Sequence, residues 1–390
     1  MSADRYRRVL RSPDLRIVFG VTLVSVIGVT SIAPALPLIA RDLALTEEKV
    51  VMLITVFTLP GIVLSPVMGM MADRFGRKRV IVPSLFLFGI AGTACAFTDD
   101  YAILLLLRFA NGVGAASLGG LNQTVIGDMF EGNARTAALG YNSSVLGVGT
   151  MAYPAIGGAL ALLGWRYPFL ISALALPVAL AVMVRLKNPE PPAPSPMGSY
   201  LFQSMRSIMR GGVLTSYWAT FAFFTVMYGS YLSYLPFLMH ERFGAAPWVI
   251  GLMMAAASVT TVSGAFNLER IERRFGSRRI IIASLLMYAV SVFSMLYPDR
   301  ILLMVPPVLL FGFAGGIAIP SIQNRLTGGS DMEHRGMFMS MNSMVLRLGQ
   351  TTGPFLAGLA FERWGMEGVW HSAAIFSLAS FVILALLLED

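Results

Sequence analysis

The sequence predicts an all-α membrane protein made of two pseudo-symmetric six-helix bundles. Three observations support this fold class. Of the 390 residues, 56% are hydrophobic and only 13% are charged, whereas soluble domains are about 25% charged. Apolar runs of about 20 residues, long enough to cross a bilayer, recur along the whole chain. A fixed offset relates the first half of the chain to the second.

Twelve transmembrane helices are predicted, six in each half. They lie near residues 17–39, 50–72, 80–97, 103–126, 138–160, 166–184, 213–238, 248–267, 280–297, 301–324, 337–360 and 369–388. The N-terminal bundle is predicted over 1–184, a cytoplasmic linker over 185–212 and the C-terminal bundle over 213–390. The linker begins with a proline-rich stretch that predicts an extended chain. It ends at 201–210 with apolar residues on one helical face, which predicts an amphipathic helix on the inner leaflet.

The two halves share matched residues at an offset of 200 positions. Such a repeat indicates a duplicated half. The matched pairs are Gln123 and Gln323, Arg135 and Arg335, Asn142 and Asn342, Gly149 and Gly349, Pro154 and Pro354, and Gly158 and Gly358.

Basic residues predict the orientation in the membrane. With the N-terminus in the cytoplasm, 21 of the 29 Lys and Arg residues lie on the cytoplasmic side, as the positive-inside rule requires. Both termini are therefore predicted to be cytoplasmic. The net charge of +8 is interpreted as an anchor to the lipid bilayer, and no nucleic-acid partner is expected.

The predicted helices 1, 5, 7 and 11 contain Pro residues, which can bend a helix, or Gly residues, which let a neighbouring helix approach closely. Pro34 and Pro37 near the end of helix 1, and Pro236 near the end of helix 7, either bend these helices or terminate them. Helices 5 and 11 are rich in Gly and Pro. This pattern favours an interface between the two halves that moves, with simple close packing as the alternative.

A charged loop separates helices 2 and 3 and returns in altered form between helices 8 and 9. The first copy is Gly69-Met70-Met71-Ala72-Asp73-Arg74-Phe75-Gly76-Arg77-Lys78-Arg79, and the second runs over 273–279. The pattern Gly-x-x-x-Asp-Arg-x-Gly-Arg-Lys in a six-plus-six chain resembles the major facilitator superfamily. Arg108 with Gly112, and the Gly/Pro run of helix 5, resemble the twelve-helix drug:proton antiporters, although Asn111 and Tyr153 depart from that pattern.

The resemblance implies two bundles around a central cavity that opens alternately to each side, the major facilitator fold. It implies that Asp73 faces the start of helix 11 and that Arg77 pairs with Asp128, which biases the chain toward its outward-open state. The alternative is that these charges only satisfy the positive-inside rule. The residues of the predicted conformational switch are Gly69, Asp73, Arg74, Gly76, Arg77, Asp128 and Arg135.

The charges predicted at membrane depth are all basic. None of the 21 acidic residues falls within a predicted span, whereas Arg108 and Arg347 do. A central Arg is costly and must face the cavity or a polar partner. Arg108 is assigned either to proton coupling or to helix bracing. Arg347 is expected to face the cavity and to bind an anionic or zwitterionic headgroup.

Polar and aromatic residues near the same depth complete the candidate site. Many of the amides can instead join helices by hydrogen bonds. The aromatic residues of helix 7, at 217, 221, 224, 228 and 231, either line the cavity or pack. The predicted substrate-binding residues are Arg347, Asn122, Gln123, Asn142, Tyr228, Tyr231, Gln323, Asn342 and Gln350.

These features predict a secondary active transporter, and not an enzyme, in a bacterial inner membrane. The expected activity is drug-like efflux of a small amphipathic molecule by alternating access, with proton antiport, by a monomer. Two alternatives remain: an importer or facilitator of an organic anion, sugar or lysolipid without proton antiport, and a non-transporting membrane sensor. No cofactor is expected, and the lone Cys95 and the scattered His residues predict no disulfide and no metal site.

Overall fold

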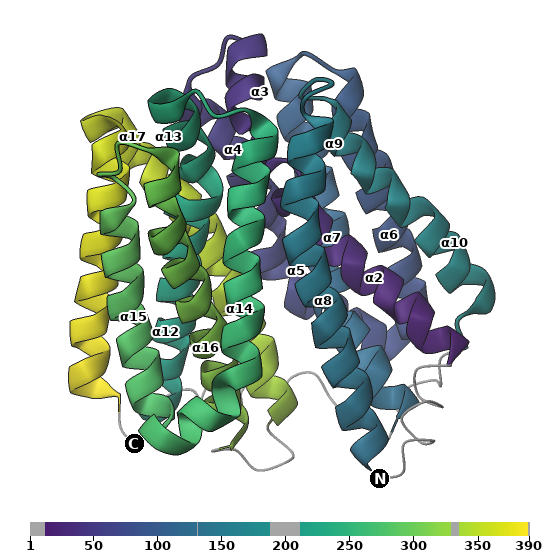
Figure 1. Cartoon of the computed structure of the whole chain (residues 1–390). Helices are drawn as coiled ribbons and strands as arrows, with labels where there is room; N and C mark the ends of the chain where they lie inside the picture. The colour runs from purple at the N-terminus through teal and green to yellow at the C-terminus, as the bar shows by residue number, and fades with distance from the viewer. Residues whose placement is uncertain (1–11, 131, 188–210, 329–334, 389–390) are drawn as a thin grey trace.

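Secondary structure in the described part of the chain is entirely helical. The computed structural model describes residues 12–130, 132–187, 211–328 and 335–388 (Figure 1), and no strand occurs within these ranges. Ten segments are long and apolar enough to cross a bilayer. The predicted class, an all-α integral membrane protein, is confirmed. The predicted amphipathic helix at 201–210 lies outside the described residues.

The first half of the chain alternates long helices with short 3-10 turns. Its elements are α2 (Pro13–Thr30), η1 (Ala33–Ala35), α3 (Leu36–Asp42), α4 (Glu47–Thr58), α5 (Pro60–Phe75), α6 (Arg77–Ala94), η2 (Cys95–Phe97), α7 (Tyr101–Met129), α8 (Gly132–Leu160), α9 (Tyr167–Leu170), η3 (Ile171–Leu174) and α10 (Ala175–Arg185).

The second half has the same alternation, with one π-helical segment. Its elements are α12 (Gly211–Val226), the π-helical η4 (Met227–Leu232), α13 (Ser233–Phe243), α14 (Pro247–Phe275), α15 (Ser277–Ser294), the 3-10 turn η5 (Ile301–Met304), α16 (Val305–Gly328) and α17 (Arg335–Leu387).

Two elements account for the difference between ten candidate spans and the predicted twelve. Helix α17 is 53 residues long and covers both the eleventh and the twelfth predicted spans. It is divided at Gly365, where φ 66° and ψ −161° are not helical. Helix α8 is 29 residues long, but it is not among the ten spans that qualify by length and composition.

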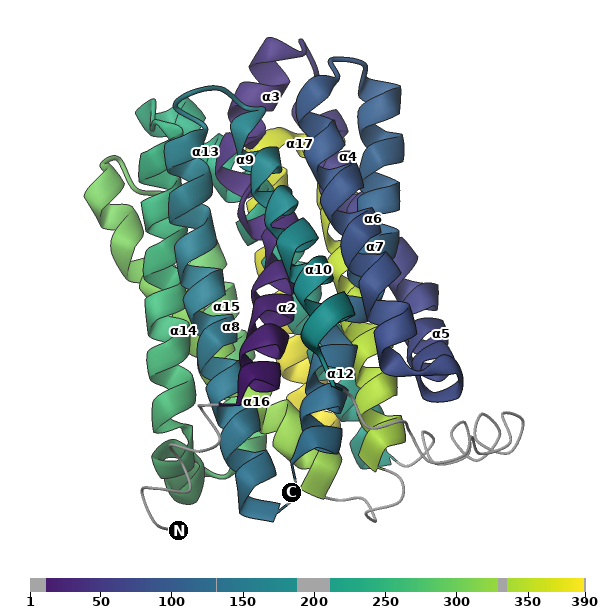
Figure 2. The same ribbon diagram turned by 90° about the vertical axis from the view of Figure 1, so that its right-hand side faces the viewer.

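The two halves contact each other along two helix–helix interfaces and close one end of the molecule. Helix α2 begins and α17 ends at the same end, here called the proximal end; the opposite, distal end contains α3 (Figures 1 and 2). Helix α8 packs along α14, and α17 packs against α4 and α5. At the distal end α13 of the second half contacts α3, η1 and α4 of the first. These contacts close the distal end.

The prolines of the predicted helices 1 and 7 do not terminate these spans. After α2 the chain forms η1 and continues as α3 to Asp42, with Pro34 and Pro37 in the first turns of these segments. Pro236 lies inside α13, which continues to Phe243. Both spans therefore extend beyond their predicted ends.

The small residues of the predicted helices 5 and 11 pack differently. A Cβ built on Gly158 of α8 would lie 2.3 Å from the carbonyl oxygen of Pro247 on α14. A Cβ built on Gly251 of α14 would lie 2.2 Å from the carbonyl oxygen of Pro154 on α8. In α17, by contrast, a Cβ on Gly353 would lie 2.4 Å from the carbonyl oxygen of Thr225, within the second half. Gly158 of α8 thus faces the other half, whereas Gly157 of α8, next to Ser31, and Gly353 of α17 serve packing within one half.

Candidate functional site

Arg347 is a half-buried cation on the face of α17 that meets the first half. Its Nη1 donates to Oε1 of Gln350, one turn away, at 3.1 Å. No other hydrogen bond from this guanidinium is found within the described residues. Since a guanidinium has five donor hydrogens, most of them are available to a bound acceptor.

The side chain of Arg347 crosses the line between the halves. Its Cδ lies 3.0 Å from the position of a Cβ on Gly61 of α5, and its Nη2 lies 3.6 Å from that of Gly119 on α7. Beside it, Oγ1 of Thr351 donates to Oγ1 of Thr58 at 3.0 Å. Arg347 therefore lies where α17 meets α4, α5 and α7.

A proline break shapes the first-half side of this site. The second predicted span is split into α4 and α5 at Leu59, and Pro60 starts α5. Proline has no N–H donor, so the helical hydrogen bonds are interrupted here. Oγ1 of Thr58 also bonds to the carbonyls of Ile54 and Thr55, both at 3.1 Å. Together with Gly61, this break leaves room for the Arg347 side chain.

Helix 7 contributes one aromatic wall, but its aromatic residues do not share one face. Tyr228 is half-buried, and its phenol is the group that interacts electrostatically with Arg347. Tyr231 is buried and stacks on Phe311 at 4.6 Å between ring centroids. The reason is η4, because a π turn rotates the residues that follow it relative to a regular α-helix. Of the two predicted tyrosines, only Tyr228 lies beside Arg347.

The predicted amides of the first half join helices of that half. Nδ2 of Asn122 on α7 donates to Oγ1 of Thr22 on α2 at 2.8 Å, and that hydroxyl donates to Oδ1 of Asn142 on α8 at 2.5 Å. Gln123, next to Asn122, is exposed. The network connects α2, α7 and α8.

In the second half, Oγ1 of Thr220 on α12 donates to Oδ1 of Asn342 on α17 at 2.7 Å. These two residues and Gln323 of α16 line a small recess, together with Phe223, Phe224, Ile319, Ile322 and Leu346. Of the predicted amides of the second half, Gln350 contacts Arg347, whereas Gln323 and Asn342 line this separate recess.

Arg108 is fully buried within the first half and is 1% exposed. Its guanidinium donates to the carbonyls of Leu53 at 3.1 Å and Gly28 at 2.8 Å, and to Oδ1 of Asn111 at 2.9 Å. Its Cζ also lies 4.2 Å from the centre of the Phe57 ring. These contacts connect α2, α4 and α7.

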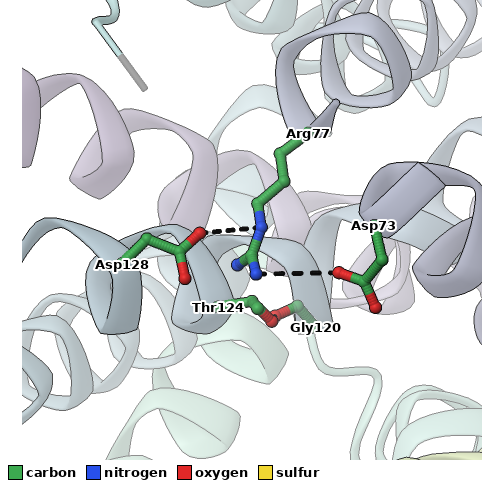
Figure 3. A network of polar contacts seen from close by, with 5 residues as sticks. All are labelled: Asp73, Arg77, Gly120, Thr124 and Asp128. Atoms are coloured by element: carbon green, nitrogen blue, oxygen red, sulfur yellow. Dashed lines mark hydrogen bonds and ion pairs between the residues drawn. The ribbon is translucent and has the colours of Figure 1, made fainter. Parts of the chain in front are cut away.

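At the proximal end Arg77 lies between two carboxylates. Its Nε is 2.8 Å from Oδ2 of Asp128 at the end of α7, and its Nη2 is 3.6 Å from Oδ1 of Asp73 at the end of α5 (Figure 3). The Arg77 side chain is 7% exposed, whereas that of Asp73 is 61% exposed. The pairing of Arg77 with Asp128 that the family resemblance implies is present. It joins two helices of the first half while the distal end is closed, so the expectation that this pair favours the state open at the distal end is wrong. Asp73 is accessible.

The loop around this ion pair needs one special glycine. Gly76 has φ +95°, and its repeat partner Gly276 has φ +77°, a region that residues with a Cβ rarely adopt. Arg74 lies over the ring of Phe75 at 5.5 Å, and the second half repeats this contact at 274 and 275. Among the other predicted switch residues, a Cβ on Gly69 would meet nothing within 4 Å. The guanidinium of Arg135 on α8 packs against Gly127, the residue that precedes Asp128.

Sequence reasoning missed the small residues that complete the central site. Thr58, Gly61, Gly119 and Thr351 are common in any membrane helix, so neither composition nor spacing distinguishes them. Pro60 was the usable signal, because a proline inside an apolar run marks a break beside which a cavity can form.

The geometry suits reversible binding and offers no set of groups for covalent chemistry. An Arg with available donors recognises a carboxylate, phosphate or sulfonate, and Tyr228 and Phe224 provide flat apolar surface. Within the described ranges, no group of His, Cys, Asp or Glu could hold a metal ion.

Comparison with known proteins agrees with this architecture. The chain is 26% identical over 368 residues to the tetracycline resistance protein, class C, of Escherichia coli, with 92% of each chain covered. It is 25% identical over 358 residues to the bacillibactin exporter of Bacillus subtilis, covering 88% of this chain and 89% of the exporter. Among solved structures, a point mutant of the nucleoside transporter NupG superimposes with a TM-score of 0.80 at 12% identity, covering 96% of this chain and 99% of that one.

The family model of the Major Facilitator Superfamily matches residues 18–328 and 238–390, which together span nearly the whole chain. With the helical fold and the proximal loop described above, this match shows that the chain belongs to the Major Facilitator Superfamily of membrane transporters.

Proposed function

We propose that this transporter exports a small amphipathic molecule that has an anionic or zwitterionic group, by alternating access. The observation that supports the proposal is the position of Arg347, half-buried where the halves meet and with most of its donors available. In the described chain, the only hydrogen-bond partner of its guanidinium is Gln350. Tyr228 beside it provides apolar surface for the rest of the substrate.

The same proposal assigns the chain twelve membrane crossings. It counts α8 as one crossing and divides α17 at Gly365 into two. Both termini then lie at the proximal end, which the distribution of Lys and Arg places in the cytoplasm of a bacterial cell, with the chain in the inner membrane. In this proposal one chain supplies the whole site, and the transporter acts as a monomer.

The loop around Arg77 acts as the conformational switch in this proposal. With the distal end closed, Asp73 is exposed and its ion-pair partner in the described chain is Arg77. Closure of the proximal end would bring Asp73 to the start of α17, where a helix N-terminus stabilises a carboxylate by about 0.3–1 kcal/mol. That contact favours the state open at the distal end.

Outward transport is supported by the similarity to the bacillibactin exporter, and proton antiport by the resemblance of the sequence to the drug:proton antiporters. Proteoliposomes test the central claim: substrate uptake is measured against a panel of anionic, zwitterionic, neutral and cationic amphiphiles. Loss of one charged hydrogen-bond donor costs about 1.5–3 kcal/mol, so Arg347→Ala should weaken apparent affinity for the preferred anionic substrate about 10- to 150-fold. Arg347→Lys should retain part of it.

Arg363 provides the matched control, because it is an exposed Arg on the same helix. Arg363→Ala should leave affinity unchanged. A preference for cationic amphiphiles, or equal affinity of wild type and Arg347→Ala, would contradict the proposal.

A second candidate is a facilitator of organic anions that uses no protons. The feature that favours it is the absence of any acidic residue from the predicted spans, where cation exporters commonly place a carboxylate. If substrate movement persists at the same rate after the pH gradient is collapsed, this candidate replaces the antiporter.

A further inference from the structure

The distal closure contains a contact between two carboxyl groups from different halves. Glu47 is the first residue of α4, and Glu241 lies in the last turn of α13. Helices α4 and α13 contact each other here, which brings the two carboxyl groups within interaction range. Two carboxylates repel each other at short range, so this arrangement favours a state in which the pair holds one proton.

Two buried polar atoms next to this pair have no partner in the described chain. One is Oε2 of Glu47 and the other is the hydroxyl of Tyr234 on α13, a residue that is 0% exposed. The position of a Cβ on Gly358 of α17 lies 3.8 Å from that hydroxyl and 3.7 Å from Cβ of Glu48. The Tyr234 hydroxyl therefore lies near the start of α4, where it interacts electrostatically with Glu47 and Glu48.

Within the described part of the chain, no cation neutralises this cluster. The charged groups that act on Glu47 are Glu241 and Glu48, both acidic. Glu48 accepts a hydrogen bond from Oγ1 of Thr46, and as a first-turn residue it already supplies the negative charge that a helix N-terminus favours.

The other charged or titratable groups around the cluster have partners of their own. On α3, Arg41 is paired with Asp42, and on α7 the hydroxyl of Tyr101 donates to the carbonyl of Lys49. Arg242, next to Glu241, donates to the carbonyls of Leu296 and Pro298 on the far side of α13. A metal ion is also ruled out as the ligand within the described ranges, since no three acidic or His residues there have suitable spacing. The remaining ligand is a proton.

We propose that Glu47 and Glu241 form a proton-binding latch between the two halves: they share one proton while the distal end is closed and release it when the halves separate. Glu47 comes from α4 and Glu241 from α13, so opening the distal end pulls the two carboxyls apart. Each then ionises in water.

The latch makes the ratio of closed to open molecules depend on pH, and the direction of this dependence is defined. Because the proton is bound only in the closed state, lowering the pH on the distal side favours closure. One proton changes the ratio of closed to open molecules by up to about tenfold per pH unit. The proton enters and leaves on the same side, so the latch regulates opening and is distinct from the coupling proton of the proposed antiport.

The test measures the distal distance between the halves in substrate-free protein, so it does not depend on transport. Spin labels are placed at Leu163 and Leu302, which are exposed in the distal loops of the two halves. In lipid nanodiscs, the closed population of the wild-type protein should grow as the pH falls from about 9 to about 5. Glu47→Gln and Glu241→Gln should each stay predominantly closed and lose this pH response.

Asp42→Asn is the matched control, because Asp42 is an acidic residue at the same end that pairs with Arg41. It should keep the wild-type response. The latch is overturned if the wild-type distance does not change with pH, or if both Gln variants respond as the wild type does. Two variants on different helices ensure that misfolding of one leaves the other informative. Failure of the transport assay with an intact pH response would instead remove the proposed function alone.

Discussion

Gly251 lies at the closest approach of the two halves, and adding one methyl group there should open the distal end. A Cβ on Gly251 would lie 2.2 Å from the carbonyl oxygen of Pro154, whereas ordinary contact begins at 3.4 Å. In Gly251→Ala, α14 and α8 must therefore separate by about 1.2 Å or distort. Overpacking of this kind costs about 1–3 kcal/mol.

Because this contact joins different halves, the cost falls mainly on the closed distal state. The ratio of closed to open molecules should therefore fall by about 5- to 150-fold. The assay is the distance between spin labels at Leu163 and Leu302 at one fixed pH. The added methyl group acts on a contact between the halves and not within either of them, so the thermal unfolding temperature should change little.

Gly140 on α8 provides the control, since a Cβ there would meet nothing within 4 Å. Gly140→Ala should leave the distance distribution unchanged. If Gly251→Ala gave the same distribution as wild type, the close approach of α8 and α14 would not limit opening. The reasoning would fail equally if Gly140→Ala shifted the distribution as far.

Three further predictions concern the buried and proximal charges. Arg108→Lys retains the charge but cannot reach Gly28, Leu53 and Asn111 together, so thermal stability in detergent should fall by several degrees; unchanged stability would remove the bracing role. Asp73→Asn should slow transport without changing apparent substrate affinity, because Asp73 does not contact Arg347; a changed affinity in a kinetic titration would contradict this. Arg77→Gln should lower thermal stability more than Asp73→Asn, because the Asp128 carboxylate then loses its partner at 2.8 Å.

The fold could be predicted from sequence because its determinants are periodic and redundant. Apolar length specified the spans, and the offset of 200 residues specified the duplication. Local exceptions were harder to predict. The π segment η4 has no sequence signature, and it places Tyr231 against Phe311 when a regular helix would have aligned it with Tyr228.

Candidate residues can be selected from the sequence where burying one side chain is energetically costly. They are overlooked where several residues of ordinary type act together. A charge at membrane depth stands out in a sequence, so Arg347 and Arg108 could both be selected. The sequence does not distinguish their environments, because the carbonyls that accept hydrogen bonds from Arg108 belong to helices that are distant in sequence. The latch was missed for the opposite reason: Glu47 and Glu241 lie at helix ends, where acidic residues are ordinary, and only folding brings them together.

The repeat itself explains why the central site has one charge. At the offset of 200, Arg347 corresponds to Gly147, whose Cβ position lies 3.1 Å from Val262 of α14. At this position α8 has a glycine that packs closely against the other half. At the matching position α17 has Arg347, whose side chain lies against Gly61. Residues that support the frame, such as Gly76 and Gly276, kept one conformation in both copies. Residues at the contact between the halves differ between the two copies, so at this position only the second half contributes a cation.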